Sequence, residues 1–225
     1  MSPADPLLGR RPHRDRPTLC LWGEVRLPLA RVHEVCGRSR RTLALRFAAA
    51  TEGPVIWIAP AWGSDPLNAC GVVPLLSPGR LLVVRPDRAD DMLWSMEEAL
   101  RTGCVPVVVA DLSDPPGMTA VRRLHLAAEA AVGNRAPHRP LGLLLTSGEG
   151  GAPGIETRWQ LEPAHLPGHD RWRLERLRAR MAPPKSWWLE GDRLSSDAGG
   201  AGQAPRNGSA ALAVRHRAEP QVARG

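Results

Sequence analysis

The sequence predicts an α/β domain with a doubly wound, mostly parallel sheet and an antiparallel hairpin at its C-terminal end. Two features of the chain predict this fold. Short apolar runs bounded by turn residues recur along it, as expected for strands that are buried on both faces of a parallel sheet. Segments with helical spacing of apolar residues separate these runs, and this alternation is typical of parallel strands joined by right-handed crossovers.

The expected elements follow one another at a regular rhythm. Strands are expected over Val32–Val35, Val55–Ile58, Leu81–Val84, Val105–Leu112, Leu141–Thr146 and Glu156–Leu161. Helices are expected over Arg41–Ala50, Asp90–Arg101 and Thr119–Ala131. The hairpin is expected from Arg171–Arg180 and Ser186–Glu190, with Ala182-Pro183-Pro184 at its turn. The apolar segment Leu19–Leu29 is expected to pack on the domain, with its element type left open, and Pro60–Gly71 is expected to be a loop with one helical turn.

Both ends of the chain differ in composition from its centre. Residues 1–18 mix proline, arginine and aspartate without an apolar period, so a flexible leader is expected. Residues 191–225 have too little apolar content to form a core, and a disordered tail is expected there. The domain is therefore expected to span residues 19–190, which suits a chain of 225 residues.

Charge and cysteine content narrow the class of protein. The formal charge of +7 comes almost wholly from arginine, because Lys185 is the only lysine. Arginine pairs with carboxylates and phosphates, which permits contact with nucleic acid, although the base composition of the genome explains the enrichment equally well. Cys20, Cys36, Cys70 and Cys104 form no C-x-x-C pair, so they predict neither a zinc site nor a disulfide framework. No signal peptide or membrane helix is apparent, and a cytoplasmic location is expected.

The segment Arg31–Phe47 reads as a strand, a glycine turn and a helix, the arrangement that carries the phosphate loop in nucleotide-binding proteins. A working loop reads G-x-x-x-x-G-K-[ST], because backbone N–H groups cradle the phosphates, lysine reaches them and the hydroxyl holds magnesium. This chain has Gly37-Arg38-Ser39-Arg40-Arg41-Thr42, which is two residues short, lacks the second glycine and has arginine instead of lysine. The sequence therefore predicts a degenerate phosphate loop.

Several strings, taken together in order, resemble the ImuA family, RecA-like proteins of bacterial damage-induced mutagenesis. They are RVHEVCG and RRTLAL within 31–45, GPVIWIAPAW at 53–62, GRLLVVRPDRADDMLW at 79–94, EEALRTG at 97–103, VVVADL at 107–112 and RRLHLAAEA at 122–130. The resemblance covers roughly residues 31–185 and implies a RecA-like, doubly wound sheet.

The resemblance also implies which residues would form a nucleotide site. In RecA-like proteins the first loop binds ATP, a glutamate after the second strand activates water, and a later strand supplies an aspartate associated with magnesium. Thr42 matches the hydroxyl position and Asp111 the aspartate, whereas the glutamate position falls near Ala61, where no carboxylate exists. Neither ATPase activity nor a bound cofactor is expected. An anion could still be attracted by Arg40, Arg41 and the helix N-terminus, which leaves a degenerate set of contacts: Gly37, Arg40, Arg41, Thr42 and Asp111.

The expected C-terminal hairpin interleaves arginine with tryptophan and leucine. Such a surface is typical of protein interfaces or of sites that contact single-stranded DNA, and an inert edge protected by its charges is the alternative. Its candidate partner-binding residues are Arg171, Trp172, Arg173, Arg176, Arg178, Trp187 and Trp188.

Isolated tryptophans and histidines complete the candidate residues. Trp57 lies within an apolar strand and is expected in the core, whereas Trp62, beside a loop, suits either the core or a partner surface. His33 and His125 have no ligand partners at metal spacing, so structural roles and no metal site are expected.

The resemblance implies a non-catalytic accessory protein of mutagenic translesion DNA synthesis. Its implied partners are the ImuB polymerase-like protein, an error-prone DnaE-type polymerase and RecA, with weak or indirect contact with DNA and association with the nucleoid on DNA damage. Two alternatives stay open. One is an ATPase with an arginine-substituted loop, which Thr42 and Asp111 favour. The other is an inhibitor of cell division similar to SulA, which shares the RecA-related fold, although the C-terminal hairpin favours ImuA.

Overall fold

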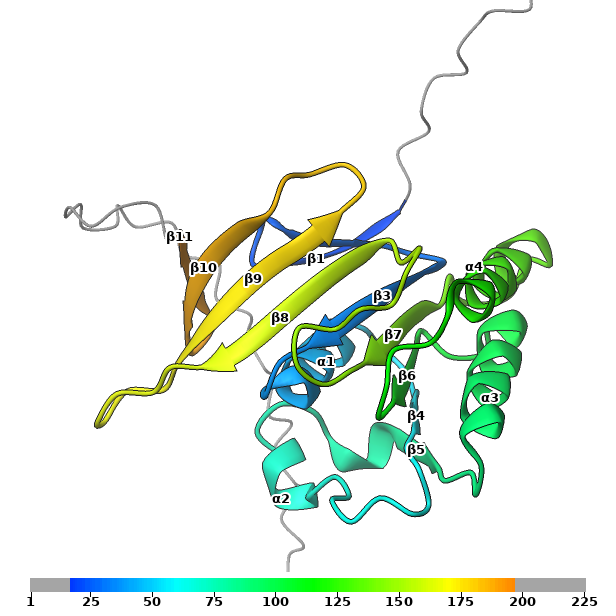
Figure 1. The fold of residues 1–225 in the computed structure, drawn as a ribbon, viewed down its shortest axis with the longest axis horizontal. Coiled ribbons are helices and arrows are strands. Elements are labelled where there is room, and N and C mark those ends of the chain that lie inside the picture. The colour runs from blue at the N-terminus through cyan, green and yellow to red at the C-terminus, as the bar shows by residue number, and fades with distance from the viewer. Residues whose placement is uncertain (1–16, 197–225) are drawn as a thin grey trace, which may run out of the picture.

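The computed structural model describes residues 17–196, in which one large mixed sheet carries helices on both faces (Figure 1). Its parallel strands are β3 (Arg31–Cys36), β4 (Val55–Ile58), β5 (Leu81–Val84), β6 (Val107–Asp111), β7 (Leu141–Leu145) and β8 (Thr157–Pro163). Three more strands extend it antiparallel, and they are β9 (Arg171–Ala179), β10 (Lys185–Glu190) and β11 (Arg193–Ser196). The helices are α1 (Arg40–Ala49), α2 (Ala69–Val72), α3 (Ala89–Thr102) and α4 (Met118–Gly133).

The strands lie in the order β11-β10-β9-β8-β3-β7-β6-β4-β5. Neighbours from β8 to β5 pair in parallel, and those from β8 to β11 pair antiparallel. The prediction of an α/β fold with a mostly parallel sheet and a C-terminal hairpin is therefore confirmed. One strand, β7, separates β3, which precedes the glycine turn, from β6, which ends in Asp111.

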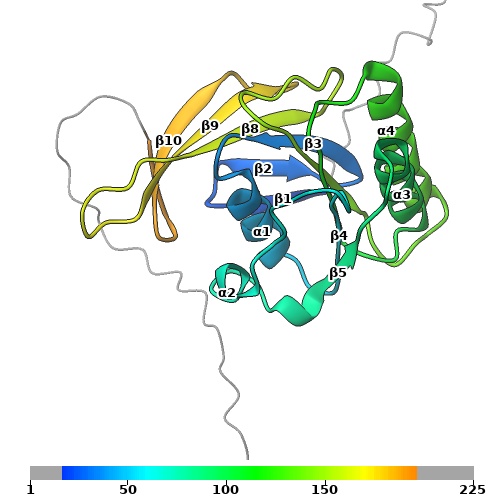
Figure 2. The same ribbon diagram turned by 60° about the horizontal axis from the view of Figure 1, so that its bottom comes forward.

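Two apolar layers hold the helices to the sheet. On one face, α1 packs together with a small hairpin of β1 (Thr18–Leu21) and β2 (Val25–Pro28), and Phe47 and Leu27 are fully buried there. On the other face, α3 and α4 bury Met96 and Leu124 against the sheet. Figure 2 shows these two groups of elements on opposite sides. Each such side chain contributes about 1.5–3 kcal/mol on burial, so both layers stabilise the sheet.

Helix α3 shows how the local sequence sets the ends of an element. Two aspartates lie in its first turn, where carboxylates interact favourably with the helix dipole. Met92, Met96 and Leu100 form its buried stripe. The helix ends at Gly103, whose φ is +57°, and a Cβ there would lie 2.7 Å from the Cβ of Ala136. Glycine is therefore required both by the backbone conformation and by the close approach.

The antiparallel strands close one end of the core. The indoles of Trp159 and Trp187 stack with ring centroids 5.9 Å apart, and Leu174 and Leu189 lie beside them in the same apolar layer as α1. Aromatic stacking of this kind adds about 0.5–1.5 kcal/mol to the burial of the rings. The hairpin is thus part of the domain's core.

The expected bounds of the domain need correction at both ends, and Thr18, expected in the flexible leader, begins β1 and pairs with Pro28. Residues 193–196 form β11, although a disordered tail was expected from residue 191, because Leu194 packs against the core and Gly191 adopts the φ of +57° that the turn needs. The segment left open at Leu19–Leu29 is the β1–β2 hairpin, and the helical turn expected in 60–71 is α2, which extends to Val72. The rest of the expected tail and residues 1–16 of the expected leader lie outside the described residues.

A truncation test measures what β11 contributes. A chain ending at Gly191 loses Leu194 from the core and the ion pair between Arg46 and Asp192, whose atoms lie 2.7 Å apart. We expect its thermal midpoint to be about 3–8 °C below that of a matched chain ending at Ser196. Differential scanning calorimetry of the two chains checks this, and equal midpoints would show that β11 adds nothing to stability.

Candidate functional site

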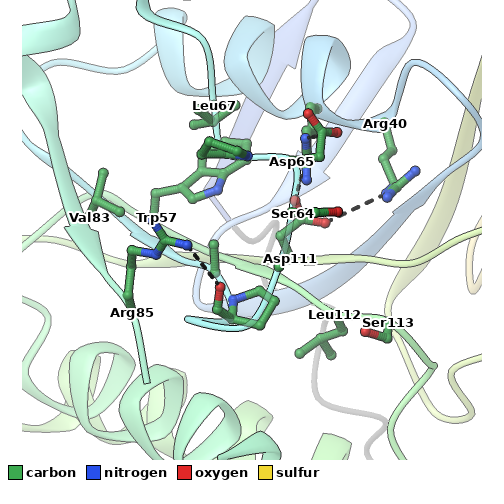
Figure 3. Close-up of a pocket in the computed structure, with 15 residues that line it drawn as sticks. Arg40, Trp57, Ser64, Asp65, Leu67, Val83, Arg85, Asp111, Leu112 and Ser113 are labelled. Carbon is green, nitrogen blue, oxygen red and sulfur yellow. Dashed lines mark hydrogen bonds and ion pairs between the residues drawn. The ribbon is translucent and has the colours of Figure 1, made fainter. Parts of the chain in front are cut away.

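The candidate site lies at the carboxyl ends of β4, β5 and β6, beside the start of α1. Ligands of open α/β sheets bind at this edge, where the loops after the strands converge. A pocket of about 250 Å³ occurs there (Figure 3). Its lining comes from α1, from the loops after β4 and β6 and from the end of β5, and it includes Arg40, Arg41, Trp57, Ser64, Asp65, Arg85 and Asp111.

The backbone N–H groups of the glycine turn are already bonded within the protein. Four consecutive donors are satisfied in this way: Gly37 to the carbonyl of Gly148 at 3.0 Å, Arg38 to Oε1 of Glu162 at 3.0 Å, Ser39 to the carbonyl of Leu161 at 3.0 Å and Arg40 to the carbonyl of Gly37 at 3.3 Å. A phosphate loop binds its ligand through N–H groups of this kind. In this conformation they are not free to cradle a phosphate.

Gly37 allows the turn to press against β8. Its φ is +87°, and a Cβ would lie 2.6 Å from the carbonyl oxygen of Leu161 and 2.7 Å from Oε1 of Glu162. Glu162 also accepts a hydrogen bond from Nε of Arg38 at 2.9 Å. A carboxylate of the protein thus contacts the turn where a phosphate loop would bind its anion.

Two arginines of α1 converge on one buried carboxylate. Nε of Arg41 lies 2.5 Å from Oδ2 of Asp111, and Nε of Arg40 lies 3.6 Å from Oδ1 of the same residue. Asp111 is 4% exposed, and Arg41 also reaches Oδ2 of Asp65 at 2.7 Å. Figure 3 shows the side chain of Arg40 directed at Asp111. Because guanidinium groups neutralise both of its oxygens, Asp111 has no oxygen left uncompensated for a magnesium ion.

The structure brings together three of the five residues predicted for the nucleotide site. Arg40, Arg41 and Asp111 line one pocket. Gly37 and Thr42 do not line it, and Gly37 is buried against β8 instead. Thr42, which matches the hydroxyl position of a phosphate loop, therefore does not line the pocket that contains Asp111.

Two charged residues of the pocket were missed by the sequence prediction. Asp65 lies in the loop after β4, and Arg85 follows β5 and donates from Nη2 to the carbonyl of Ala61 at 3.2 Å. Neither belongs to a recognisable motif, since each acts only through residues distant in sequence. Trp57 is buried as predicted and forms one wall of the pocket, and Trp62, left open by the sequence, is 53% exposed.

A buried carboxylate that the sequence did not indicate supports the turn. Glu34 on β3 is fully buried and pairs with Nε of Arg158 at 2.6 Å. It also accepts hydrogen bonds from Oγ1 of Thr146 at 2.8 Å and from the backbone N–H groups of Gly151 at 2.8 Å and Ala152 at 3.1 Å. These bonds satisfy a charge that would otherwise be costly to bury. They also fix the loop that carries Gly148, the acceptor for Gly37.

Both histidines singled out in the sequence have structural partners, as predicted. His33 contacts Oγ1 of Thr157 at 2.7 Å, and burial lowers its pKa to about 3. Nδ1 of His125 accepts from the N–H of Val32, so Nε2 carries the proton and donates to the carbonyl of Gly154. Burial, and then the charge of Arg31, lowers the pKa of His125 to about 4. Among residues 17–196, no group of three or more His, Cys, Asp or Glu side chains could hold a metal ion.

The hairpin residues predicted to bind partners divide between the two faces of the sheet. Trp187 is 1% exposed and lies in the core, so the prediction that it faces a partner is wrong. The guanidinium of Arg176 lies over the rings of Trp159 and Trp187, and burial lowers the pKa of Arg176. Trp172 packs against the same core and lies 5.5 Å from the guanidinium of Arg46.

The remaining residues predicted to bind partners lie on the other face of the hairpin. Arg171 lies over the ring of Trp188 at 4.1 Å from the centroid, and Trp188 is half-buried. Arg173 and Arg178 are exposed. Side chains alternate along a strand, so Arg171, Arg173 and Trp188 share one face. Arg178 lies on the same face, beyond the irregularity in the pairing of β8 with β9. We call these four residues the outer hairpin face.

The buried histidines predict a loss of stability in mild acid. Between about pH 6.5 and pH 4 the unfolded chain takes up protons that His33 and His125 do not bind in the folded protein, so stability falls as the pH falls. Each histidine contributes a slope of about 1.4 kcal/mol per pH unit within this range. Urea unfolding at pH 7.5 and 5.5 measures the loss. His125→Asn, which keeps an acceptor for the N–H of Val32, should remove roughly half of it, and an unchanged loss would refute the assignment.

Comparison with known proteins assigns no role to these residues. No protein-family model and no curated protein matches the sequence. None of the helices in residues 17–196 has the length and apolar content needed to cross a membrane. The chemistry of the pocket and of the outer hairpin face therefore has to be inferred from their geometry and from the strings that resemble ImuA.

Proposed function

We propose that the protein is a non-catalytic accessory protein with a RecA-like fold that acts as a scaffold in damage-induced mutagenic translesion DNA synthesis. The resemblance to ImuA supports this role and names the ImuB polymerase-like protein and an error-prone DnaE-type polymerase as partners, with RecA as a further contact. Under this proposal the protein works in the cytoplasm, associates with the nucleoid on DNA damage and contacts DNA weakly or indirectly.

One observation carries the non-catalytic part of the proposal. The N–H groups of residues 37–40 donate to acceptors of the protein itself, and Arg41 and Arg40 contact Asp111. Backbone carbonyls and the carboxylate of Glu162 thus take the N–H groups that a phosphate would need, and guanidinium groups lie beside the oxygens of Asp111 that magnesium would need. Phosphoryl transfer depends on positioning and charge neutralisation, and losing one preorganised donor alone costs about 3–4 kcal/mol of transition-state stabilisation.

The same geometry weighs against the ATPase alternative. Its support was Thr42 and Asp111, but Thr42 does not line the pocket and Asp111 is neutralised by arginine. At the position expected for the catalytic glutamate, near Ala61, the backbone carbonyl accepts from Arg85 and no carboxylate is present. The nearest acid in that loop, Asp65, is paired with Arg41.

A scaffold binds its partners through its surface, and the outer hairpin face has the composition of a binding surface. It combines arginine with a half-buried tryptophan, the residue types enriched in binding hot spots. Arg171 stacks on Trp188, which would fix the ring in place before a partner arrives. The tryptophans of the other face are already used in the core.

Anion binding separates the scaffold from the ATPase. Asp111→Asn removes the charge that neutralises Arg40 and Arg41, so we expect it to bind inorganic pyrophosphate about threefold to tenfold more tightly than the unaltered protein. Neither protein should hydrolyse ATP above background. Isothermal titration calorimetry and phosphate release measure both properties, with circular dichroism as the control for folding. Magnesium-ATP binding that Asp111→Asn weakens would instead support the ATPase.

Co-purification tests the outer hairpin face. Arg173→Glu with Arg178→Glu reverses two exposed charges without touching Trp159 or Trp187, so the fold should persist while capture of ImuB or RecA falls about tenfold. The matched control is Arg135→Glu, an exposed arginine after α4. FtsZ is included, because its capture would favour the SulA-like alternative. Unchanged capture of ImuB and RecA would place the interface elsewhere.

A further inference from the structure

The edge strand β5 carries no charged side chain, and three of its four side chains are exposed in the structure of residues 17–196. It lies at one end of the sheet and pairs with β4 (Figure 1). Leu82 is 52% exposed, Val83 55% and Val84 36%. Because side chains alternate along a strand, Leu82 and Val84 face one side of the sheet and Val83 the other. Three consecutive apolar residues therefore contact solvent on an open edge.

The opposite edge of the sheet shows the usual protection of an exposed strand. There β11 carries Arg193, Ser195 and Ser196, and its one large apolar residue, Leu194, packs on the core. Charged and polar side chains on an edge strand prevent pairing with another chain. The strand β5, with the sequence LLVV, lacks this protection.

The backbone geometry identifies the groups that a new strand would use. The carbonyl of Val84 accepts from the N–H of Ala59 at 3.0 Å, so the polar groups of Val84 face the β4 side. The N–H and C=O of successive residues alternate in direction, and those of Val83 consequently face away from β4. In the part of the chain that the structure describes, no strand pairs with that side of β5.

The charges at the two ends of β5 select the kind of occupant. Arg80 precedes the strand and Arg85 follows it, and both donate to backbone carbonyls and pair with no carboxylate among residues 17–196. Antiparallel pairing of two copies centred on Val83 would place Arg85 of one copy within one residue of Arg80 in the other. Like charges would then approach at both ends, which disfavours a symmetric dimer.

The chain's own remaining apolar segments match the edge no better. In the sequence, Leu7-Leu8 has Asp5 before it but is followed within three residues by Arg10 and Arg11, and Ala210–Val214 is followed by Arg215. Both segments would bring further positive charge to Arg80 or Arg85. A complementary occupant has an apolar centre with acidic residues at its ends.

We propose that β5 binds an extended segment of a partner protein as an added strand, and that this segment has an apolar centre flanked by aspartate or glutamate. Main-chain hydrogen bonds to Val83 would supply affinity, and the flanking charges would supply selectivity. The inference does not depend on the role in translesion synthesis, because the edge would accept such a strand in any pathway.

Two synthetic peptides test the proposal on the full chain. Both have the same centre of alternating valine and threonine, and one has aspartate and glutamate at its ends where the other has lysine and arginine. Fluorescence anisotropy at low salt should show about fivefold tighter binding of the acidic peptide, and 0.5 M salt should reduce the difference. Val83→Pro removes the outward N–H and should weaken binding by at least about tenfold. Val83→Thr, which keeps the N–H and the branched shape, should weaken it by less than about threefold.

Each result of these binding experiments either supports or overturns the proposal that β5 binds an added strand. If Val83→Pro does not fold, Arg85→Glu, which lies outside the strand, should shift the preference by about fivefold toward the basic peptide. Equal binding of both peptides to the unaltered protein, or binding that Val83→Pro leaves unchanged, would overturn the proposal. So would a dimer in sedimentation that Val83→Pro dissociates, because the edge would then belong to a second copy. None of these measurements uses ImuB, RecA or a polymerase, so a failure here leaves the proposed function standing.

Discussion

The bonding of the glycine turn to β8 determines what the rest of the molecule can do. Gly148, Leu161 and Glu162 accept the N–H groups that a phosphate loop would offer to its ligand. These acceptors stay in place because Glu34, buried on β3, binds both Arg158 of β8 and the loop after β7. The turn is thus satisfied by the same strand that continues the sheet into the antiparallel hairpin. Opening it for a nucleotide would require several hydrogen bonds to break together, each with its own cost when left unmade.

Replacing lysine by arginine changes the chemistry of the pocket as well as its charge. A lysine ammonium is a compact charge on a flexible stem, whereas the planar guanidinium presents several donors in a fixed arrangement. Arg41 uses that arrangement to contact Asp111 and Asp65 at once, and Arg40 approaches the other oxygen of Asp111. The pocket therefore holds two acids already matched with two cations. Such a site discriminates against a metal that needs free carboxylate oxygens and keeps its shape without a ligand.

The sequence was sufficient to predict the elements of the sheet but not the partners of the turn. Buried strands such as β6 and β7 are continuous apolar runs, and their bounds lie within two residues of those predicted. The acceptors for the N–H groups of residues 37–39 lie more than a hundred residues further along the chain, at Gly148 and in β8, and no local pattern connects them. The burial of Glu34 was hidden for the same reason, because an isolated acid in a strand gives no sign of a distant arginine.

The sequence alone could have predicted that Trp187 and Trp188 lie on opposite faces of the hairpin. Alternation along β10 places Lys185, Trp187 and Leu189 on one face and Trp188 on the other. The sequence prediction considered only the arginine and tryptophan content of the hairpin and ignored this two-residue alternation. It therefore placed both Trp187 and Trp188 on the surface. The strand β11 was harder to foresee, because RLSS has one large apolar residue and depends on the exposed side of β10 for its hydrogen bonds.

The two ends of the sheet carry surfaces of different chemistry. On the outer hairpin face near the β11 end, the guanidinium of Arg171 lies over the ring of Trp188, so the positive charge is fixed in position and the ring is partly covered. At the β5 end, aliphatic side chains and the backbone groups of Val83 face outward between two arginines, and no strand within residues 17–196 pairs with them. A surface of the first kind favours planar or acidic groups, and one of the second kind favours an extended backbone. Seven strands lie between the edge strands β11 and β5, so one partner could contact the outer hairpin face while another pairs with β5, which is the geometric requirement for a scaffold.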